Sequence, residues 1–340
     1  MSKEGAETPN RWVRSVASIT MAYNAEGTLR RQLDALLGQT ATLQEIIVVD
    51  NASIDGTAAM LTAQYPQVTV LRMHDNLGAA GAWAAGLMYA TTVKKYDWVW
   101  TFDDDSVPDA NALEILLQGF SSLGASNPKI GMLAPLPIDR QAGRSYPPIL
   151  WRNGFVRGST SLLQQPVWMA DLVIASGCMV SRELVDAIGL PRSDFFMDVF
   201  DLEYCIRART KGYKIAVITE ARLTHEIGNT REVHLSGSKR LWMNQPAWRE
   251  YYISRNLIYL AWWLYPKFAT KISIARYMME HLAGVLLFST NRLACAWKMV
   301  QGCVDGLRGR LGIRFRPDAK GSRATGMISK AVEKIQIGKA

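Results

Sequence analysis

The sequence predicts an α/β fold: a mostly parallel sheet flanked by helices, followed by a basic helical extension. Short apolar runs typical of buried strands alternate with helical patterns over the first third of the chain. Hydrophobic residues make up 49% of the 340 residues, which is enough to build a large core. Residues 266–340 hold 14 Lys and Arg against 4 Asp and Glu, so the net charge of +9 is concentrated there. We therefore expect an α/β domain over 14–230 and a basic helical extension over 231–340.

The first strand–helix pairs can be placed in order. Strands are expected at 14–23, 45–50 and 68–73, where β-branched and apolar residues run together. Each is followed by a helical pattern, at 28–40, 58–65 and 81–93. The first of these helices has leucines at helical spacing, and Gly38 is its stop signal. A fourth strand is expected at 97–102, and this alternation favours parallel pairing with right-handed crossovers.

The rest of the chain is less regular. A helix is expected at 112–120, within a stretch up to residue 166 that is otherwise rich in Pro and Gly. A strand, a small-residue turn and a helix are expected over 173–189. A helix from near Asp201 to Gly212 and a strand at 214–219 follow. Beyond Arg231 the pattern is helical, amphipathic and basic.

Polar clusters follow each of the first four strands. They are Tyr23 with Asn24, Asp50 with Asn51, His74 with Asn76, and the run Asp103, Asp104 and Asp105. The carboxyl ends of parallel strands meet at one edge of the sheet, and folds of this class bind ligands there. The four clusters therefore predict one site.

The acid run raises a choice, because three adjacent carboxylates repel one another and gain no packing at a strand end. Either water screens them on a loop or a cation neutralises them. Side chains alternate along an extended chain, so Asp103 and Asp105 can converge on one ion, and Pro108 helps to pin the loop. The Gly and the closing Glu of an EF-hand are missing, which disfavours Ca²⁺. Two carboxylates that leave room for phosphate oxygens suit Mg²⁺ or Mn²⁺.

Composition also bears on location and partners. The polar N-terminal segment has no signal-peptide pattern. The cysteines Cys178, Cys205, Cys295 and Cys303 lack metal-type spacing, so we expect reduced thiols in a cytoplasmic protein. The basic tail suits nucleic acid, anionic lipid or a phosphorylated substrate, but no nucleic-acid-binding signature is present, so that partner is not expected. Apolar runs at 257–265 and 282–288 are too short to span a bilayer, so the extension is expected to lie on a membrane surface.

Eight short segments carry information about the family. They are "ITMAYNAEGTLRRQLDALLGQT", "IIVVDNASIDGT", "HDNLGAAGAWAAG", "WTFDDDS", "ASGCMVSRE", "DVFDLEYCIRARTKGYKI", "LTHEIG" and "YYISRN". In this order and spacing they resemble family-2 glycosyltransferases of the nucleotide-diphospho-sugar type, over roughly residues 14–312. With "FFMDVFDLEYCIRARTKGY" and "GCVDGLRGRLG", the chain is most similar to bacterial rhamnosyltransferases and next to galactofuranosyltransferases. The resemblance implies a GT-A type nucleotide-diphospho-sugar transferase domain over 14–230.

The resemblance also implies roles on the donor side. The residues that match the family's pocket for the pyrimidine nucleoside are Ala22, Tyr23, Asn24, Asn51 and Asn76. Asp50 matches the carboxylate that bonds the base edge. Asp103 and Asp105 match the outer acids of the Asp-x-Asp motif, which bridge ribose, metal and diphosphate, and Asp103 and Asp104 are expected to bind the nucleotide-sugar. His225 matches a late histidine that completes metal coordination in many members.

The catalytic base is expected at one of two acids. Counting back from Arg207, Asp201 matches the family's base. Relatives often have two adjacent acids there, whereas Asp198 and Asp201 are separated by two residues, so Asp198 stays a second candidate. Simpler roles exist as well. Asp50 could be a turn or N-cap acid, His225 a structural histidine, and Asp201 a residue that favours the positive end of a helix dipole.

The sequence therefore predicts an inverting, metal-dependent glycosyltransferase attached peripherally to the inner face of the cell membrane. The expected donor is dTDP-rhamnose, with a UDP-sugar as the alternative, and the acceptor is a saccharide or a polyprenyl-diphosphate-linked saccharide for surface polysaccharide. A galactofuranosyltransferase or another hexosyltransferase is the alternative within the family. A sugar-nucleotide nucleotidyltransferase would need a Gly-rich loop with Lys or Arg after the first strand, which "AYNAEGT" lacks. A non-catalytic saccharide-binding protein would lack the base or metal acids, and both sets are present. The sequence specifies neither the linkage nor the oligomeric state.

Overall fold

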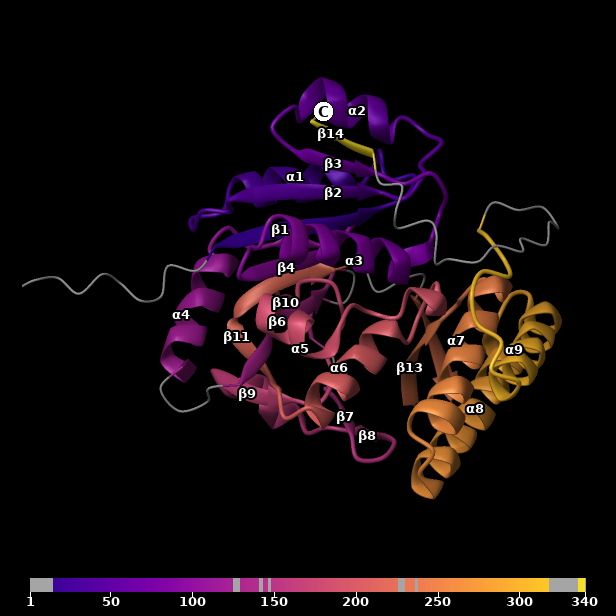
Figure 1. The fold of residues 1–340 in the computed structure, drawn as a ribbon. Coiled ribbons are helices and arrows are strands. Elements are labelled where there is room, and N and C mark those ends of the chain that lie inside the picture. The colour runs from indigo at the N-terminus through magenta and orange to yellow at the C-terminus, as the bar shows by residue number, and fades with distance from the viewer. Residues whose placement is uncertain are drawn as a thin grey trace, which may run out of the picture.

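A mixed sheet is the centre of the structure (Figure 1), and ten of its strands lie within the described residues. The computed structural model describes residues 15–124, 129–140, 143–145, 148–225, 230–235, 238–317 and 336–339. Four parallel strands form its first half, in the order β3-β2-β1-β4. They are β1 (Val16–Ala22), β2 (Glu45–Asp50), β3 (Thr69–Arg72) and β4 (Trp98–Asp103). All four expected strands are therefore present at the expected places.

The second half of the sheet is mixed in direction. Beyond β4 the order is β10 (Met179–Ser181), β6 (Ile130–Asp139), β11 (Lys214–His225) and β5 (Val107–Pro108), with β9 (Val167–Ala170) also paired to β11. β6 and β11 are parallel to each other, whereas β10, β5 and β9 pair antiparallel with their neighbours. The parallel pairing expected from the first third therefore describes only part of the sheet. Among the described residues, no helix separates β5 from β4 or β10 from β9, whereas helices at Ala112–Gly124 and Phe200–Thr210 precede the parallel strands β6 and β11. Connections without a helical crossover permit antiparallel pairing.

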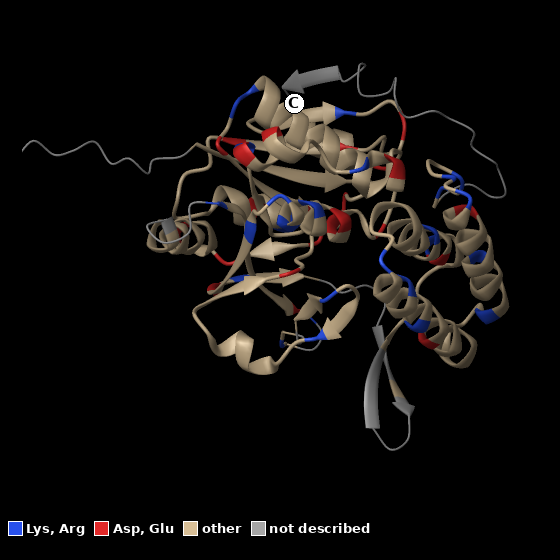
Figure 2. Cartoon of the chain, turned by 60° about the horizontal axis from the view of Figure 1, so that its bottom comes forward, with Lys and Arg blue, Asp and Glu red and all other residues tan. Residues whose placement is uncertain are grey.

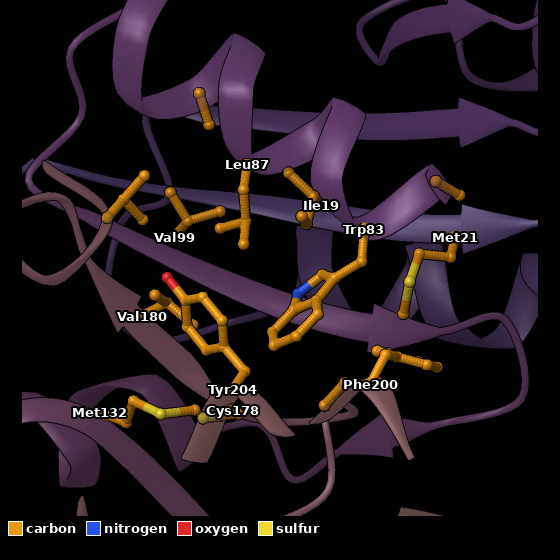
Figure 3. Packing of buried hydrophobic residues seen from close by; sticks show 14 of the residues in the cluster. Ile19, Met21, Trp83, Leu87, Val99, Met132, Cys178, Val180, Phe200 and Tyr204 are labelled. Atoms are coloured by element: carbon orange, nitrogen blue, oxygen red, sulfur yellow. The ribbon is translucent and has the colours of Figure 1, made fainter. Parts of the chain in front are cut away.

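Helices cover both faces of the sheet. The expected helices are present as α1 (Leu29–Leu37), α2 (Thr57–Gln64), α3 (Gly78–Met88), α4 (Ala112–Gly124), α5 (Arg182–Ile188) and α6 (Phe200–Thr210). One buried cluster joins α3, α5 and α6 to the sheet, and a second joins α1, α2 and α4 to it. In the first cluster the Trp83 ring lies 5.7 Å from that of Phe200 and 5.2 Å from that of Tyr204 (Figure 3). This packing fixes the start of α6 against α3, close to the edge where β4 ends.

Residues 230–243 differ from the helical pattern expected beyond Arg231. They form an antiparallel hairpin of β12 (Thr230–Leu235) and β13 (Ser238–Met243), with six residue pairs from Thr230 with Met243 to Leu235 with Ser238. Polar and apolar residues alternate in "EVHL", the second part of β12, which is the period of a strand. A second small hairpin, β7 (Ile149–Trp151) with β8 (Phe155–Arg157), lies in the Pro/Gly-rich region.

Three long helices follow the hairpin, as the sequence predicted. They are α7 (Ala247–Tyr259), continued by a π-turn, α8 (Phe268–Phe288) and α9 (Arg292–Leu307). α9 crosses α7 closely because Gly302 and Gly306 face its backbone: added Cβ atoms would lie 2.3 Å from Tyr251 O and 2.5 Å from Arg255 O. The last described strand, β14 (Gln336–Lys339), pairs with β3, so the end of the chain returns to the α/β sheet.

Within the described part of the chain, no helix combines the length and the apolar character needed to cross a membrane.

Candidate active site

A cavity of about 640 Å³ lies at the carboxyl ends of β1, β2 and β4, between the sheet and α7. The residues expected at the site that line it are Ala22, Tyr23, Asn51, Asn76, Asp103, Asp104, Asp105, Asp198, Asp201 and His225. Strand register explains this convergence. Ala22 pairs with Asp50 across β1 and β2, and Met21 pairs with Asp103 across β1 and β4. The polar clusters that follow separate strands therefore meet at one edge of the sheet, as the sequence predicted.

The acid run forms a short turn between β4 and β5. Its first member is held from several sides: the Asp103 N–H donates to Ser176 Oγ (3.0 Å), and its carbonyl accepts from the side chain of Gln32 and from the Ser106 N–H (3.3 Å). Ser176 Oγ donates in turn to Ser106 Oγ (2.6 Å). The turn is thus fixed by buried hydrogen bonds and is not a freely solvated loop.

His225 lies beside this turn because β5 pairs with the end of β11. Val107 pairs with Thr224, which places the residue after Thr224 next to the acids. The His225 Nδ1 atom is 3.1 Å from Asp105 Oδ1 and 2.7 Å from Ser106 Oγ. One ligand atom from each of Asp103, Asp105 and His225 fits within 4.8 Å of the other two. The three residues expected to share a cation are therefore adjacent.

The acids of the turn are crowded together and half-buried, which shifts their pKa values. Burial raises the pKa of Asp103, although the His225 charge opposes this. Burial and the charges of Asp105 and Asp103 raise the pKa of Asp104 to about 8. Burial lowers the pKa of His225, but its hydrogen bond to Asp105 and the nearby charges outweigh this, so the pKa is raised. A divalent cation would relieve this crowding, because it favours the ionised carboxylates.

The nucleoside side of the cavity is built around two asparagines. Asn51 Nδ2 donates to Asn76 Oδ1 (3.1 Å) and to Gly78 O (3.2 Å), and Asn51 Oδ1 accepts from the Leu77 N–H (2.9 Å). Asn76 Oδ1 also accepts from the Gly78 N–H (2.8 Å). These bonds fix the start of α3 at the cavity wall.

Two residues expected at the nucleoside pocket do not line the cavity. Asp50 is fully buried, and its Oδ1 accepts from the Ser53 N–H (2.9 Å) while Oδ2 lies 3.7 Å from Arg72 Nε. Asn24 is exposed with φ of 52°, and its Oδ1 accepts from the Ile54 N–H (2.9 Å). Both side chains hold the loop after β2, so in this structure they shape the wall behind the cavity. Their expected contacts with the base stay predictions.

The loop between the 3₁₀ turn η3 (Ser193–Phe195) and α6 carries the second candidate base, Asp198, in an unusual backbone conformation. Phe196, Asp198 and Val199 all have positive φ, of 64°, 59° and 67°. Such angles are rare for residues other than glycine and especially for a β-branched valine. Gly78, at φ of 70°, allows α3 to approach this loop, because a Cβ there would lie 2.0 Å from Phe196 O. A strained loop of this kind persists only when its surroundings hold it.

Arg255 and Asn256, in the "YYISRN" segment of α7, supply that support. Asn256 Nδ2 donates to the carbonyl oxygens of Phe195 (3.1 Å), Met197 (2.8 Å) and Asp198 (2.9 Å). Arg255 is fully buried, and its Nη2 donates to Phe195 O (2.8 Å) while its Nη1 donates to Gly312 O (2.5 Å). The loop beside the cavity and the segment after α9 are thus fastened to the same turn of α7.

The two candidate bases have different surroundings. Both carboxylate oxygens of Asp198 accept from Arg249, at 2.8 to 3.0 Å. Asp201 lies in the first turn of α6, and its Oδ1 accepts from the Leu202 N–H (2.8 Å). Burial raises the pKa of Asp201 from 3.8 to about 6; the Leu202 N–H opposes this, and the charges of Asp198 and Asp103 add to it. The raised pKa of Asp201 suits a group that accepts a proton.

Several cavity residues were not anticipated from the sequence. They are Met243, Gln245, Trp248, Arg249, Ile253 and Pro317, which come from β13, α7 and the segment after α9. They are far in sequence from the acids and form no polar pattern, so only the chain path places them here. Ser106, which contacts His225, was also not predicted. Its position directly after the acid run in "DDDS" is the one signal in the sequence that could have indicated it.

Comparisons with known proteins indicate a family for part of the chain. Residues 18–169 match the family model described as Glycosyl transferase family 2. The chain is 24% identical over 303 residues to the dTDP-rhamnosyl transferase RfbF of Shigella flexneri, which covers 88% of this chain and 97% of that protein. It is 25% identical over 221 residues to the galactofuranosyltransferase GlfT1 of Mycolicibacterium smegmatis, with 63% and 71% covered.

A solved structure shares the fold. The structure of GalNAc-T7 with UDP, GalNAc and Mn²⁺ superposes with a TM-score of 0.58 at 14% identity. The superposition covers 86% of this chain and 57% of that chain. At this identity the likeness concerns the fold alone.

Proposed function

We propose that this glycosyltransferase, whose chain has the GT-A fold and carries a family 2 domain, moves rhamnose from dTDP-rhamnose to a saccharide acceptor with inversion at the anomeric carbon. One observation carries the proposal: a half-buried acid–histidine trio and a carboxylate with a raised pKa line the same cavity. The trio suits the leaving diphosphate, and the carboxylate suits the attacking hydroxyl. The same cavity therefore has groups for both ends of a sugar transfer.

The donor side is proposed to hold the nucleoside against Ala22, Tyr23, Asn51 and Asn76, with the diphosphate toward the acid turn. Asp103, Asp105 and His225 would hold the cation, and their donor set of two carboxylates and an imidazole fits Mn²⁺ or Mg²⁺. When bound, a divalent cation neutralises the charge that develops on the diphosphate as it leaves. Ser106 and Ser176 keep the turn in place for this role.

The acceptor side is proposed to rely on Asp201 as the general base. The acceptor oxygen forms its bond to the anomeric carbon while the bond from that carbon to the diphosphate oxygen breaks, and Asp201 takes the hydroxyl proton. A single displacement of this kind inverts the configuration. Asp198 is a weaker candidate because both of its oxygens already accept from Arg249. We assign it to holding Arg249 at the cavity wall.

The choice of rhamnose rests on similarity, since a relative named as a dTDP-rhamnosyl transferase spans nearly all of both chains. Galactofuranose from a UDP-sugar is the alternative, supported by the galactofuranosyltransferases. A polyprenyl-diphosphate-linked saccharide is the proposed acceptor for surface polysaccharide. The chain is proposed to work in the cytoplasm on the anionic inner face of the membrane, because residues 266–340 are strongly basic.

The test is a panel of sugar nucleotides, with dTDP-rhamnose and UDP-galactofuranose as the key pair. Saturation-transfer NMR on the purified chain identifies the bound donor, and NMR of the product from a synthetic acceptor gives the anomeric configuration. We expect dTDP-rhamnose to bind and react best in the presence of Mn²⁺ or Mg²⁺. Preferred binding of another donor, or retention of configuration, would contradict the proposal.

A further inference from the structure

The outer faces of α8 and α9 expose an unusual amount of apolar surface. Of the twenty large hydrophobic side chains that are exposed in the described part of the chain, twelve lie between Trp263 and Leu307. Scattered exposed hydrophobic residues are normal, but a concentration over so short a stretch indicates an interaction surface.

On α9 these side chains form one stripe. Leu293, Trp297, Val300, Val304 and Leu307 follow one another at intervals of four and three residues, so they share one side of the helix. Leu293 is 76% exposed and Trp297 is 61% exposed. The buried residues, which include Cys295, Met299, Gly302 and Gly306, lie on the opposite side against α7. The stripe therefore points away from the rest of the molecule.

α8 has a matching stripe. Phe268, Ile272, Met279 and Leu286 are exposed and share one side, while Ile274, Met278 and Val285 are buried on the other. Phe268 is 78% exposed and Met279 is 73% exposed. We name the two stripes together the outer face of α8 and α9.

Charge identifies the occupant of this face. The exposed arginines of these helices and of the turn after α9 are Arg276, Arg292, Arg308 and Arg310, and Figure 2 shows Lys and Arg recurring on these helices. Lys271 and Lys298 are half-buried over the rings of Trp262 and Phe315. The acids of α8 and α9 are already used: Glu280 lies 3.7 Å from Arg276, and buried Asp305 accepts from Tyr251 and pairs with Arg310. A second copy of the chain docked here would bring cations against cations, which is unfavourable.

Resting on the proposed function, we propose that the outer face of α8 and α9 docks on an anionic lipid bilayer, with Trp297 and its apolar neighbours inserted at the headgroup level. Helices with an apolar side, tryptophan and flanking basic residues lie in the plane of a membrane interface in this way. The basic side chains bind the anionic headgroups, and the apolar stripes bury against the acyl boundary. Docking also sets the distance of the cavity from the membrane surface, because α9 packs on α7 and two residues of α7, Trp248 and Arg249, line the cavity.

The experiment measures co-sedimentation of the full chain with vesicles. The test variant replaces three residues of the stripe, Leu293→Ser, Trp297→Ser and Val300→Ser. The matched control replaces three exposed hydrophobic residues elsewhere, Leu37→Ser, Ile54→Ser and Val93→Ser. We expect the wild type and the control to bind phosphatidylglycerol-rich vesicles well and phosphatidylcholine vesicles weakly. The test variant should bind the anionic vesicles at least about tenfold more weakly, since it loses the apolar contribution to insertion.

Quenching by brominated lipids then reports insertion at the stripe. We expect quenching to fall in Trp297→Phe relative to the wild type, because that indole would be in the headgroup region. Equal vesicle binding by the test variant and the control, or equal quenching with and without Trp297, would overturn the proposal. So would a dimer in light scattering that the triple substitution dissociates without a change in vesicle binding.

This experiment separates the docking face from the proposed function. Vesicle binding is measured without a donor, and transfer to a water-soluble acceptor glycoside is measured without vesicles. If the triple variant loses vesicle binding while no sugar nucleotide supports transfer, the docking face stands and the proposed function falls. If transfer is normal and the triple variant binds vesicles as well as the wild type does, the proposed function stands and the docking face falls.

Discussion

The side-chain amide of Asn256 donates to the carbonyl oxygen of Asp198 across 2.9 Å, and to those of Phe195 and Met197 as well. One side chain of α7 thus spans the loop in which Phe196, Asp198 and Val199 have positive φ. This loop leads directly into α6, where Asp201 lies in the first turn. Asn256 is therefore a positioning residue for the proposed base, which it does not itself touch.

Asn256→Ala should lower kcat by about ten- to a hundredfold while the KM for the donor changes little. The variant removes the side-chain donor of Met197 O and Asp198 O, whereas Phe195 O keeps the Arg255 donor. Each buried group left unsatisfied costs about 1–3 kcal/mol, so the loop relaxes away from its strained conformation. Steady-state kinetics with varied donor concentration measures the two parameters. Asn291→Ala, at an exposed position on the same extension, is the control. An equal change in kcat for both variants would remove Asn256 from this role.

Asp201→Asn should reduce kcat by roughly 10²–10⁴-fold, as is typical for loss of a general base, and leave donor binding nearly unchanged. The asparagine keeps the shape of the side chain but cannot take the proton. Asp186→Asn, on the exposed side of α5, is the matched control. If Asp201→Asn stays active while Asp198→Asn is dead, the base is Asp198. If both variants stay active, a carboxylate base is not used at all.

Asp201→Asn should also increase the stability of the folded protein. The pKa of Asp201 is about 6 in the folded chain against 3.8 ordinarily, so the folded state binds the proton more tightly than the unfolded state does. The ionised carboxylate is then destabilising, and stability falls as the pH rises between about 4 and 6. At pH 7, Asp201→Asn should raise the free energy of unfolding by on the order of 1–3 kcal/mol. Urea titration at pH 7 and pH 4 measures this, and the gain should vanish at the lower pH.

The acid side of the pH–rate profile should move in opposite directions in two variants. kcat/KM should fall below about pH 6, because burial raises the pKa of Asp201 to about that value and only the ionised base is active. Arg249→Met leaves the charge of Asp198 unpaired, which should move this limb to higher pH. Asp198→Asn removes that charge and should move it to lower pH. A profile that stays fixed in both variants would mean that another group titrates.

Metal dependence should be measurable both as activity and as stability. EDTA should abolish transfer, and Mn²⁺ or Mg²⁺ should restore it. With Mn²⁺ at about 100 times its Kd, the free energy of unfolding should rise by about 2.7 kcal/mol, since the ion binds only the folded trio. Asp105→Asn should lose this stabilisation, whereas Asp109→Asn, at an exposed position directly after β5, should keep it. Full activity in chelator would contradict the metal assignment.

Much of the fold and the acid side of the site followed from the sequence. The strands β1, β2 and β4 are buried along nearly their whole length and are mostly apolar. Such strands are easy to predict from sequence because both of their faces are covered. Once four such strands alternate with helices, their carboxyl ends must share an edge, so the clusters ending in Asn51, Asn76 and Asp105 could be brought together before any coordinates. His225 was joined to them through the family resemblance.

The tertiary structure alone decided the acceptor side and the difference between the two acids. Asp198 and Asp201 look alike in the sequence, but their surroundings differ: Arg249 on α7 binds Asp198, whereas burial raises the pKa of Asp201. The contacts of Asn256 and the outer face of α8 and α9 likewise could not be predicted from the sequence, because both depend on how distant segments pack. Local sequence patterns predict the helices and strands and the edge of the sheet at which polar residues meet. Contacts between distant segments determine which side chains are buried, paired or left exposed to a partner.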